Sequence, residues 1–150
     1  MIRHGLKVVA AVAVLGVAGC GGDDDSNKTL SYSDFSNQAN DICKSSNEKT
    51  AGLKLTGDPK ADAEALDQAI PEVESALADF KELNPPEELK STFDQFLSIS
   101  QQQLDNAKKA QAAAESGDKA GEIAVLKATQ PLDAQSKAAG SKLGAAECAK

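Results

Sequence analysis

Apolar residues recur at three- and four-residue steps in every long segment from Ser33 to the end of the chain. This spacing places them on one face of an α-helix, and the runs of alternating β-branched residues that predict strands do not occur. Residues typical of helix starts and ends divide the region into four segments. We therefore predict an all-α domain over residues 33–150, built as an up-down four-helix bundle.

The first two predicted helices are separated by the pair Thr56-Gly57. Ser33 should cap the first helix, which should end near Leu55. Asp58 should cap the second, with Pro59 at its first position, where the missing N–H is harmless. Their expected buried positions are Phe35, Ala39, Ile42, Cys43, Ser46, Thr50 and Leu53, and then Leu66, Ile70, Val73, Leu77 and Phe80.

The third and fourth predicted helices follow two further boundaries, Asn84-Pro85-Pro86 and Gly117-Asp118. Acidic residues after the prolines favour the positive end of the third helix, and Asp118 should cap the fourth. Because the stretch Asp105–Glu115 is rich in alanine, we expect the second half of the third helix to be looser. The expected buried positions are Leu89, Phe93, Phe96, Leu97, Leu104, Ala107 and Ala114, and then Ile123, Leu126, Gln130, Ala134, Ala138 and Leu143.

Two of the predicted helices contain an internal proline, Pro71 in the second and Pro131 in the fourth. A proline inside a helix removes one backbone hydrogen bond and crowds the preceding turn. We expect both helices to be kinked at these residues, and the second to be either kinked or split in two.

Residues 1–19 have the pattern of an export signal. Arg3, His4 and Lys7 make the start basic, and the run Val8–Ala18 is apolar and uncharged. That run is too short for a transmembrane helix, which needs about 20 apolar residues. Next, Val17, Ala18, Gly19 and Cys20 resemble the lipobox of bacterial lipoproteins.

The lipobox resemblance implies cleavage before Cys20 and a diacylglyceryl group on its sulfur. Each buried methylene adds about 0.8 kcal/mol to membrane partition, so two chains would anchor the protein stably. The resemblance therefore implies the membrane as the first partner, bound through the lipid on Cys20. It also implies that the protein lies on the extracytoplasmic face of the cell membrane.

Residues 20–32 are predicted to form a lipidated, acidic and flexible tether, because Gly21–Lys28 offers no apolar side chain to bury. The run Asp23–Asp25 could suggest a calcium loop. An EF-hand requires glycine at the sixth position, where this chain has Lys28, so we favour the solvated tether.

Composition and charge mainly exclude certain kinds of core and certain classes of partner. Aromatic residues make up only 3% of the chain, so the core must be largely aliphatic. Removing residues 1–19 would take away Arg3 and Lys7 and no acidic residue, changing the net charge from −7 to −9. An acidic surface disfavours nucleic acid as a partner and disfavours direct contact with anionic lipid. The oligomeric state is left open.

Once Cys20 is assigned to lipid, Cys43 and Cys148 remain in a chain expected outside the cytoplasm. An even pair in an oxidising compartment most simply forms a disulfide, and an up-down bundle brings its first and last helices together. The bond would contribute up to about 4.7 kcal/mol in the chain-entropy model. The alternative is a redox or metal-binding pair, but the chain lacks CxxC spacing and its one histidine, His4, lies in the signal segment.

We expect no catalytic residues, no metal and no cofactor. Without histidine in the mature chain, serine and cysteine triads lack their base. Two Ser-x-x-Lys strings begin at Ser46 and Ser116, and two Glu-Ser pairs begin at Glu74 and Glu115. Each suggests a hydrolase only weakly, because the apolar walls and aromatic platforms that raise a catalytic pKa or bind a sugar are scarce.

Over its length the chain resembles small, alanine-rich lipoproteins of high-GC Gram-positive bacteria. The shared features are the lipobox, the tether, an early-helix Asn40-Asp41-Ile42-Cys43, a central Pro85-Pro86-Glu87 and the late Cys148. The resemblance implies a place and a fold. From these we expect a non-enzymatic helical binding or interaction module with an envelope-protein or cell-wall partner. The alternatives are a small-ligand carrier with a cavity above about 300 Å³ between the third and fourth helices, or a carboxylate-dependent enzyme acting on cell-wall glycan.

Overall fold

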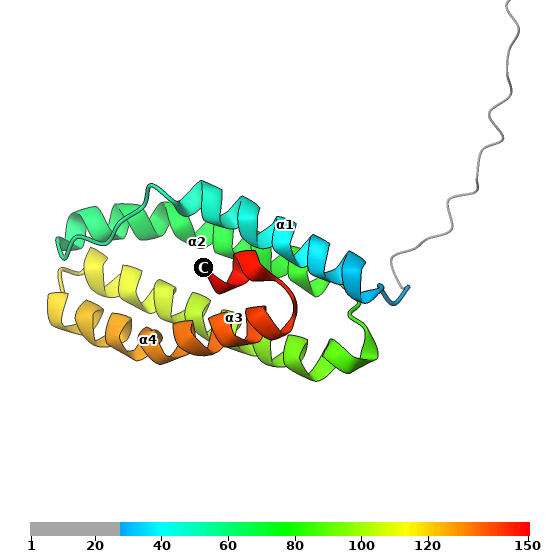
Figure 1. Cartoon of the computed structure of the whole chain (residues 1–150). Coiled ribbons are helices and arrows are strands. Elements are labelled where there is room, and N and C mark those ends of the chain that lie inside the picture. Colours follow the sequence, from blue (N-terminus) through cyan, green and yellow to red (C-terminus); the bar gives the residue numbers. More distant parts are fainter. Residues whose placement is uncertain (1–27) are drawn as a thin grey trace, which may run out of the picture.

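The structure is a computed structural model that describes residues 28–150. It confirms the predicted all-α, four-helix fold: α1 (Tyr32–Thr50), α2 (Pro59–Lys81), α3 (Glu87–Glu115) and α4 (Lys119–Lys142) pack each against the next (Figure 1). A short 3-10 helix, η2 (Ala146–Ala149), ends the chain. No strand occurs within the described residues.

The boundaries of α1 differ from the prediction. Ser31, and not Ser33, is the N-cap, because its hydroxyl oxygen accepts a hydrogen bond from the Asp34 backbone N–H at 3.1 Å and donates to the Asp34 carboxylate at 2.6 Å. The helix ends at Thr50, before the expected Leu55. Ser31 and Ser33 are two residues apart and both satisfy the local rule for an N-cap, but only Ser31 has an acidic residue three positions later and gains both bonds.

The folded body also begins earlier than the predicted boundary at residue 33. The Leu30 N–H donates to the Asn84 carbonyl at 2.9 Å, and the Leu30 side chain packs against the core. The chain before α1 is thereby attached to the α2–α3 connection.

The other helix boundaries agree with the sequence. The Asp58 carboxylate accepts from the Ala61 N–H at 2.9 Å, with Pro59 at the first helical position. Asp118 likewise caps α4 by accepting from the Gly121 N–H at 2.9 Å. Helices α2 and α4 run unbroken through Pro71 and Pro131, so the expected alternative of a split second helix is wrong. Both prolines are exposed, which leaves the carbonyl groups freed by each ring close to water.

The core consists of two clusters of side chains. One is aromatic: Phe93 meets Phe35 edge-on with ring centroids 5.2 Å apart, and Phe80 meets Phe96 at 5.1 Å. The other is aliphatic. Its buried members are Leu66, Ile70, Leu77, Leu104 and Ala110. The predicted stripes on α2 and α3 are therefore confirmed, and Ile99 and Ala110 add to the expected buried set.

The predicted buried face of α4 is largely wrong. Ile123 is 40% exposed, and Gln130, Ala134 and Ala138 also face solvent. The buried positions are instead Glu122, Ala139 and Gly140, with Leu143 buried just after the helix, as expected. The apolar residues of this helix are mostly alanines, which cover most of its circumference, so periodicity gives little information about which face turns inward.

The first and last helices do not pack directly along each other. Helix α1 packs on α2, and its other main neighbour is the C-terminal segment, residues 143–150. Figure 1 shows this segment, in red, lying between α1 and the α3–α4 pair. The C-terminal segment therefore fills the seam that α1 and α4 would otherwise share.

Candidate functional site

The sequence-predicted site residues divide into two groups. Val17, Ala18, Gly19 and Cys20, the lipobox and the lipid attachment site, lie outside the described residues. Cys43 and Cys148 lie within them and form the predicted disulfide, with Cα atoms 5.2 Å apart. Both cysteines are partly buried and pack against the aromatic cluster.

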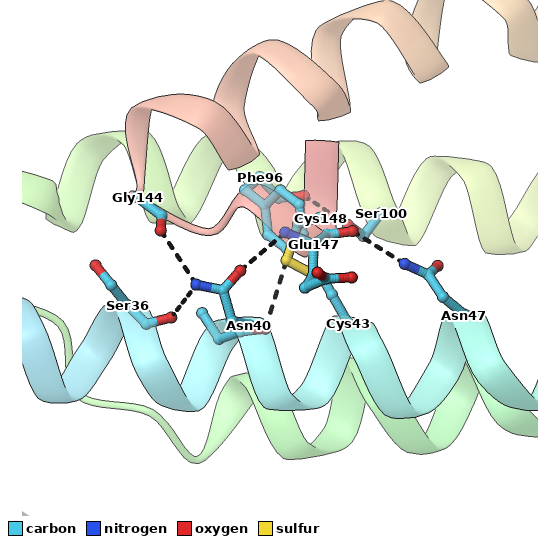
Figure 2. Close-up of a disulfide and its surroundings, with 10 residues drawn as sticks. Ser36, Asn40, Cys43, Asn47, Phe96, Ser100, Gly144, Glu147 and Cys148 are labelled. Atoms are coloured by element: carbon cyan, nitrogen blue, oxygen red, sulfur yellow. Dashed lines mark hydrogen bonds between the residues drawn. A yellow bond between two sulfur atoms is a disulfide. The ribbon is translucent and has the colours of Figure 1, made fainter. Parts of the chain in front are cut away.

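The disulfide is one part of a larger attachment between α1 and the C-terminal segment (Figure 2). The Asn40 amide nitrogen donates to the Gly144 carbonyl at 3.2 Å, and its amide oxygen accepts from the Glu147 N–H at 2.8 Å. About two turns further along α1, the Asn47 amide donates to the Glu147 carbonyl at 2.9 Å. These side chains pair backbone groups that the short 3-10 helix leaves free.

Two glycines allow the C-terminal segment to approach α1 and α4 closely. A Cβ at Gly140 would lie 3.0 Å from the Cys148 Cβ. Gly144 has φ +72°, and a Cβ there would lie 2.6 Å from the Tyr32 hydroxyl and 2.7 Å from the Ser36 hydroxyl. The Ala145 N–H donates to the Gly140 carbonyl at 3.0 Å. A hydrogen bond that spans five residues in this way typically ends a helix whose next residue is a left-handed glycine.

At the other end of the bundle, two carboxyl side chains are fully enclosed. Asp62 in the first turn of α2 is 0% exposed and Glu122 in the first turn of α4 is 1% exposed. Asp62 accepts hydrogen bonds from the Thr56 N–H at 2.6 Å, the Thr56 hydroxyl at 3.0 Å and the Gly57 N–H at 2.8 Å. Burial by itself would raise the pKa of Asp62, but these hydrogen bonds outweigh it and the pKa is lowered.

The environment of Glu122 shifts its pKa in the opposite direction. Neither of its carboxyl oxygens meets an N–H or O–H donor of the protein. Burial raises the pKa of Glu122, and the neighbouring Asp62 carboxylate raises it further, because it favours a proton on Glu122 and carries a negative charge. Because carboxylate oxygens only accept, a hydrogen bond can form between the two side chains only if one of them carries a proton, and the opposite pKa shifts place that proton on Glu122.

Sequence reasoning missed this pair, since an acidic residue in the first turn of a helix is ordinarily a solvated partner of the helix dipole. A signal was nevertheless present. Asp62 lies four residues before Leu66, and Glu122 lies four residues before Leu126, so each acid extends the apolar stripe of its helix.

A small cleft lies beside the disulfide, between α1, α2 and α3, with a volume of about 130 Å³. Leu77 and Phe80 lie at its apolar side, and Asn47, Ser100 and Gln103 contribute polar groups. It is smaller than the roughly 300 Å³ typical of ligand sites and does not lie between the third and fourth helices as expected. A larger hollow of about 640 Å³, between the start of α2 and the end of α3, is open to solvent and lined largely by exposed side chains.

The weak catalytic candidates of the sequence are not assembled into a site. Lys49 forms an ion pair with Glu72 at 2.7 Å; their hydrogen bond and the Glu72 charge raise the pKa of Lys49, opposite to what a Ser-Lys nucleophile needs. Ser116 and Glu115 are exposed at the α3–α4 turn. Glu74 is paired with Lys108 at 2.6 Å on the surface.

Between residues 28 and 150, no three histidine, cysteine or acidic side chains come together in a way that could hold a metal ion. Within the same residues, none of the helices has the length and apolar character needed to cross a membrane.

Comparison of the chain with protein-family models, with curated proteins and with solved structures finds no match.

Proposed function

We propose that this protein is an extracytoplasmic lipoprotein, held at the cell membrane by a lipid on Cys20, whose helical body is a non-catalytic interaction module. The observation that carries the proposal is the string Val17-Ala18-Gly19-Cys20 directly after a basic start and an apolar run. A disulfide that closes the body adds support, because such bonds persist in oxidising compartments.

The shape of the body suggests where a partner would bind. The described chain begins, in blue, at one end of the body, and the α1–α2 connection and the start of α4 lie at the opposite end (Figure 1). Among the described residues, Tyr32, Leu55 and Ile123 are the exposed large apolar side chains, and Leu55 and Ile123 belong to that far end. An anchored body would therefore present this end away from the membrane, toward an envelope protein or cell-wall partner.

Lipid attachment is tested by labelling cells that express the protein with radioactive palmitate. We expect label on the natural chain, no label on Cys20→Ser, and release of that variant from the membrane fraction. The matched control, Cys43→Ala with Cys148→Ala, should keep both label and membrane association. A natural chain without label, or a Cys20→Ser chain that stays in the membrane fraction, would contradict the proposal.

The interaction role is tested by photo-crosslinking in intact cells. A crosslinker at Leu55 or Ile123 should give a discrete product that is lost in the Cys20→Ser background. The control position is Ala134, which is exposed in the second half of α4. Equal products from all three positions, or none, would contradict a specific partner at the far end.

Ligand carriage is the less supported alternative, since the cleft of about 130 Å³ beside Cys43 holds only a very small molecule. It would become the leading function if a small apolar probe shifted the NMR signals of Leu77 and Phe80 with saturable binding.

A further inference from the structure

The Asp62–Glu122 pair lies where the α1–α2 connection meets the start of α4, at the far end of the bundle. Asp62 holds the α1–α2 connection through the backbone N–H groups of Thr56 and Gly57. Glu122 places the first turn of α4 against the same carboxylate. A Cβ at Gly57 would lie 4.0 Å from the Lys119 amino group, so the connection lies directly on the start of α4.

The two carboxyl groups of this pair can hydrogen-bond to each other only if they share a single proton. Asp62 as an anion accepts three hydrogen bonds from the connection, and its remaining capacity can accept one from Glu122. With the proton on Glu122, one carboxylic acid faces one carboxylate and a donor exists between them. Without it, two adjacent anions would be enclosed at 0% and 1% exposure, and the Glu122 oxygens would have no donor at all.

The surrounding charges do not substitute for the proton. The charged groups that act on Glu122 are Asp62 and Asp58 from the start of α2 and Lys119 from its own helix. Lys119 is the only cation among them and is itself exposed to solvent. The α1–α2 connection contributes the uncharged Thr56 and Gly57, and Glu115 at the end of α3 lies in the adjacent open hollow.

We propose that Asp62 and Glu122 form a one-proton latch that fastens the α1–α2 connection to the start of α4 and opens when the proton on Glu122 passes to solvent. Opening separates the two anions and frees residues 51–58 from α4. Leu55 lies in this connection and Ile123 follows Glu122, so the latch changes the apolar surface at the far end of the body.

The expected pH dependence has a definite sign. Glu122 binds its proton more tightly in the folded state, because its pKa is raised above the ordinary 4.5; its stabilisation is present at low pH and is lost as the pH rises through the raised value. Asp62 has its pKa lowered below the ordinary 3.8, so its stabilisation is present above 3.8 and is lost as the pH falls through the lowered value. The latch should be tightest in mildly acidic solution.

The test is hydrogen exchange of the Thr56 and Gly57 amides, corrected for the intrinsic pH dependence of exchange, on the protein with its disulfide intact. Between pH 5 and pH 8 their protection should fall at least tenfold, the change that corresponds to about one pKa unit. Glu122→Gln keeps a donor for Asp62 and removes the titration, so its protection should change less than about twofold. The control, Glu115→Gln, should behave like the natural chain.

Three outcomes would overturn the latch. The first is an equal loss of protection in the natural chain and Glu122→Gln. The second is a Glu122 carboxyl carbon that titrates at or below 4.5 by NMR in the natural chain, a measurement that needs no variant. The third is protection at pH 8 restored by millimolar calcium in the natural chain and not in Glu122→Gln, which would make the pair a cation site.

Discussion

Gly144 is the residue on which the approach of the C-terminal segment to α1 depends most directly. Its φ of +72° favours glycine, and the position a Cβ would take is already occupied by the hydroxyls of Tyr32 and Ser36. Gly117 has nearly the same φ, +73°, with nothing within 4 Å of its would-be Cβ. The two positions therefore separate backbone strain from steric conflict.

Gly144→Ala should lower the free energy of unfolding by about 2–4 kcal/mol, because left-handed strain and crowding add. Gly117→Ala should lower it by about 1–2 kcal/mol through strain alone. Gly52 has neither a positive φ nor a neighbour within 4 Å, and Gly52→Ala should stay within about 0.5 kcal/mol of the natural chain. Urea unfolding of the three variants measures this order, and equal losses at 144 and 117 would contradict the crowding.

At the scale of the element, the second half of α3 is built for close approach. Ala110 is 0% exposed and Ala114 is 3% exposed, whereas the first half of the same helix buries Phe93 and Phe96. Small side chains bring neighbouring helices together and bury little area per residue. The looseness expected of this half from its composition remains a prediction.

Ala110→Leu should destabilise the protein by about 1–3 kcal/mol, because the larger side chain has no space in the aliphatic cluster. Ala112 is exposed on the same helix and provides the matched control. Since leucine and alanine have similar helix propensity, Ala112→Leu should change stability by less than about 0.5 kcal/mol. Thermal unfolding of both variants measures the difference. If Ala110→Leu left the stability unchanged, the helix interface at this position would be able to accommodate a larger side chain, contrary to the prediction.

At the scale of the whole molecule, the C-terminal segment completes the bundle. It carries Leu143 and Ala145, both fully buried, into the aromatic cluster. The disulfide and the Asn40 and Asn47 amides fasten it to α1. The first helix is therefore held on one side by α2 and on the other by the last residues of the chain.

Replacing Cys43 and Cys148 together with alanine should lower the free energy of unfolding by about 2–4 kcal/mol. Hydrogen exchange should show α1 and residues 143–150 losing protection first, while α3 stays protected in the native ensemble. Reduction of the natural chain should give the same pattern. Uniform loss over all four helices would instead mean that the bundle opens as one unit.

Local chemistry determined much of this fold. Asp58, Pro59 and Asp118 act on backbone groups within one turn, so helix starts at these places could be predicted without knowing what packs against them. The stripes of α2 and α3 could also be predicted, because large apolar side chains at helical spacing must find a common interior. The Cys43–Cys148 pairing could be predicted from the even number of remaining cysteines and from the expected return of the end of the chain to the first helix, although residues 143–150, and not α4 itself, make that return.

Only the tertiary structure decided the burial and the contacts of those polar or small residues whose partners lie far away in the sequence. The sequence could not say that Glu122, and not Ile123, turns inward on α4, because the burial of an acid depends on Asp62, which lies on another helix. Nor could it say that residues 143–150 fill the seam between α1 and α4, since Asn40 and Gly144 gain their roles only when the chain returns to α1. Caps and stripes are properties of neighbouring residues; the desolvation of a charge and the filling of a seam depend on what the rest of the chain brings there.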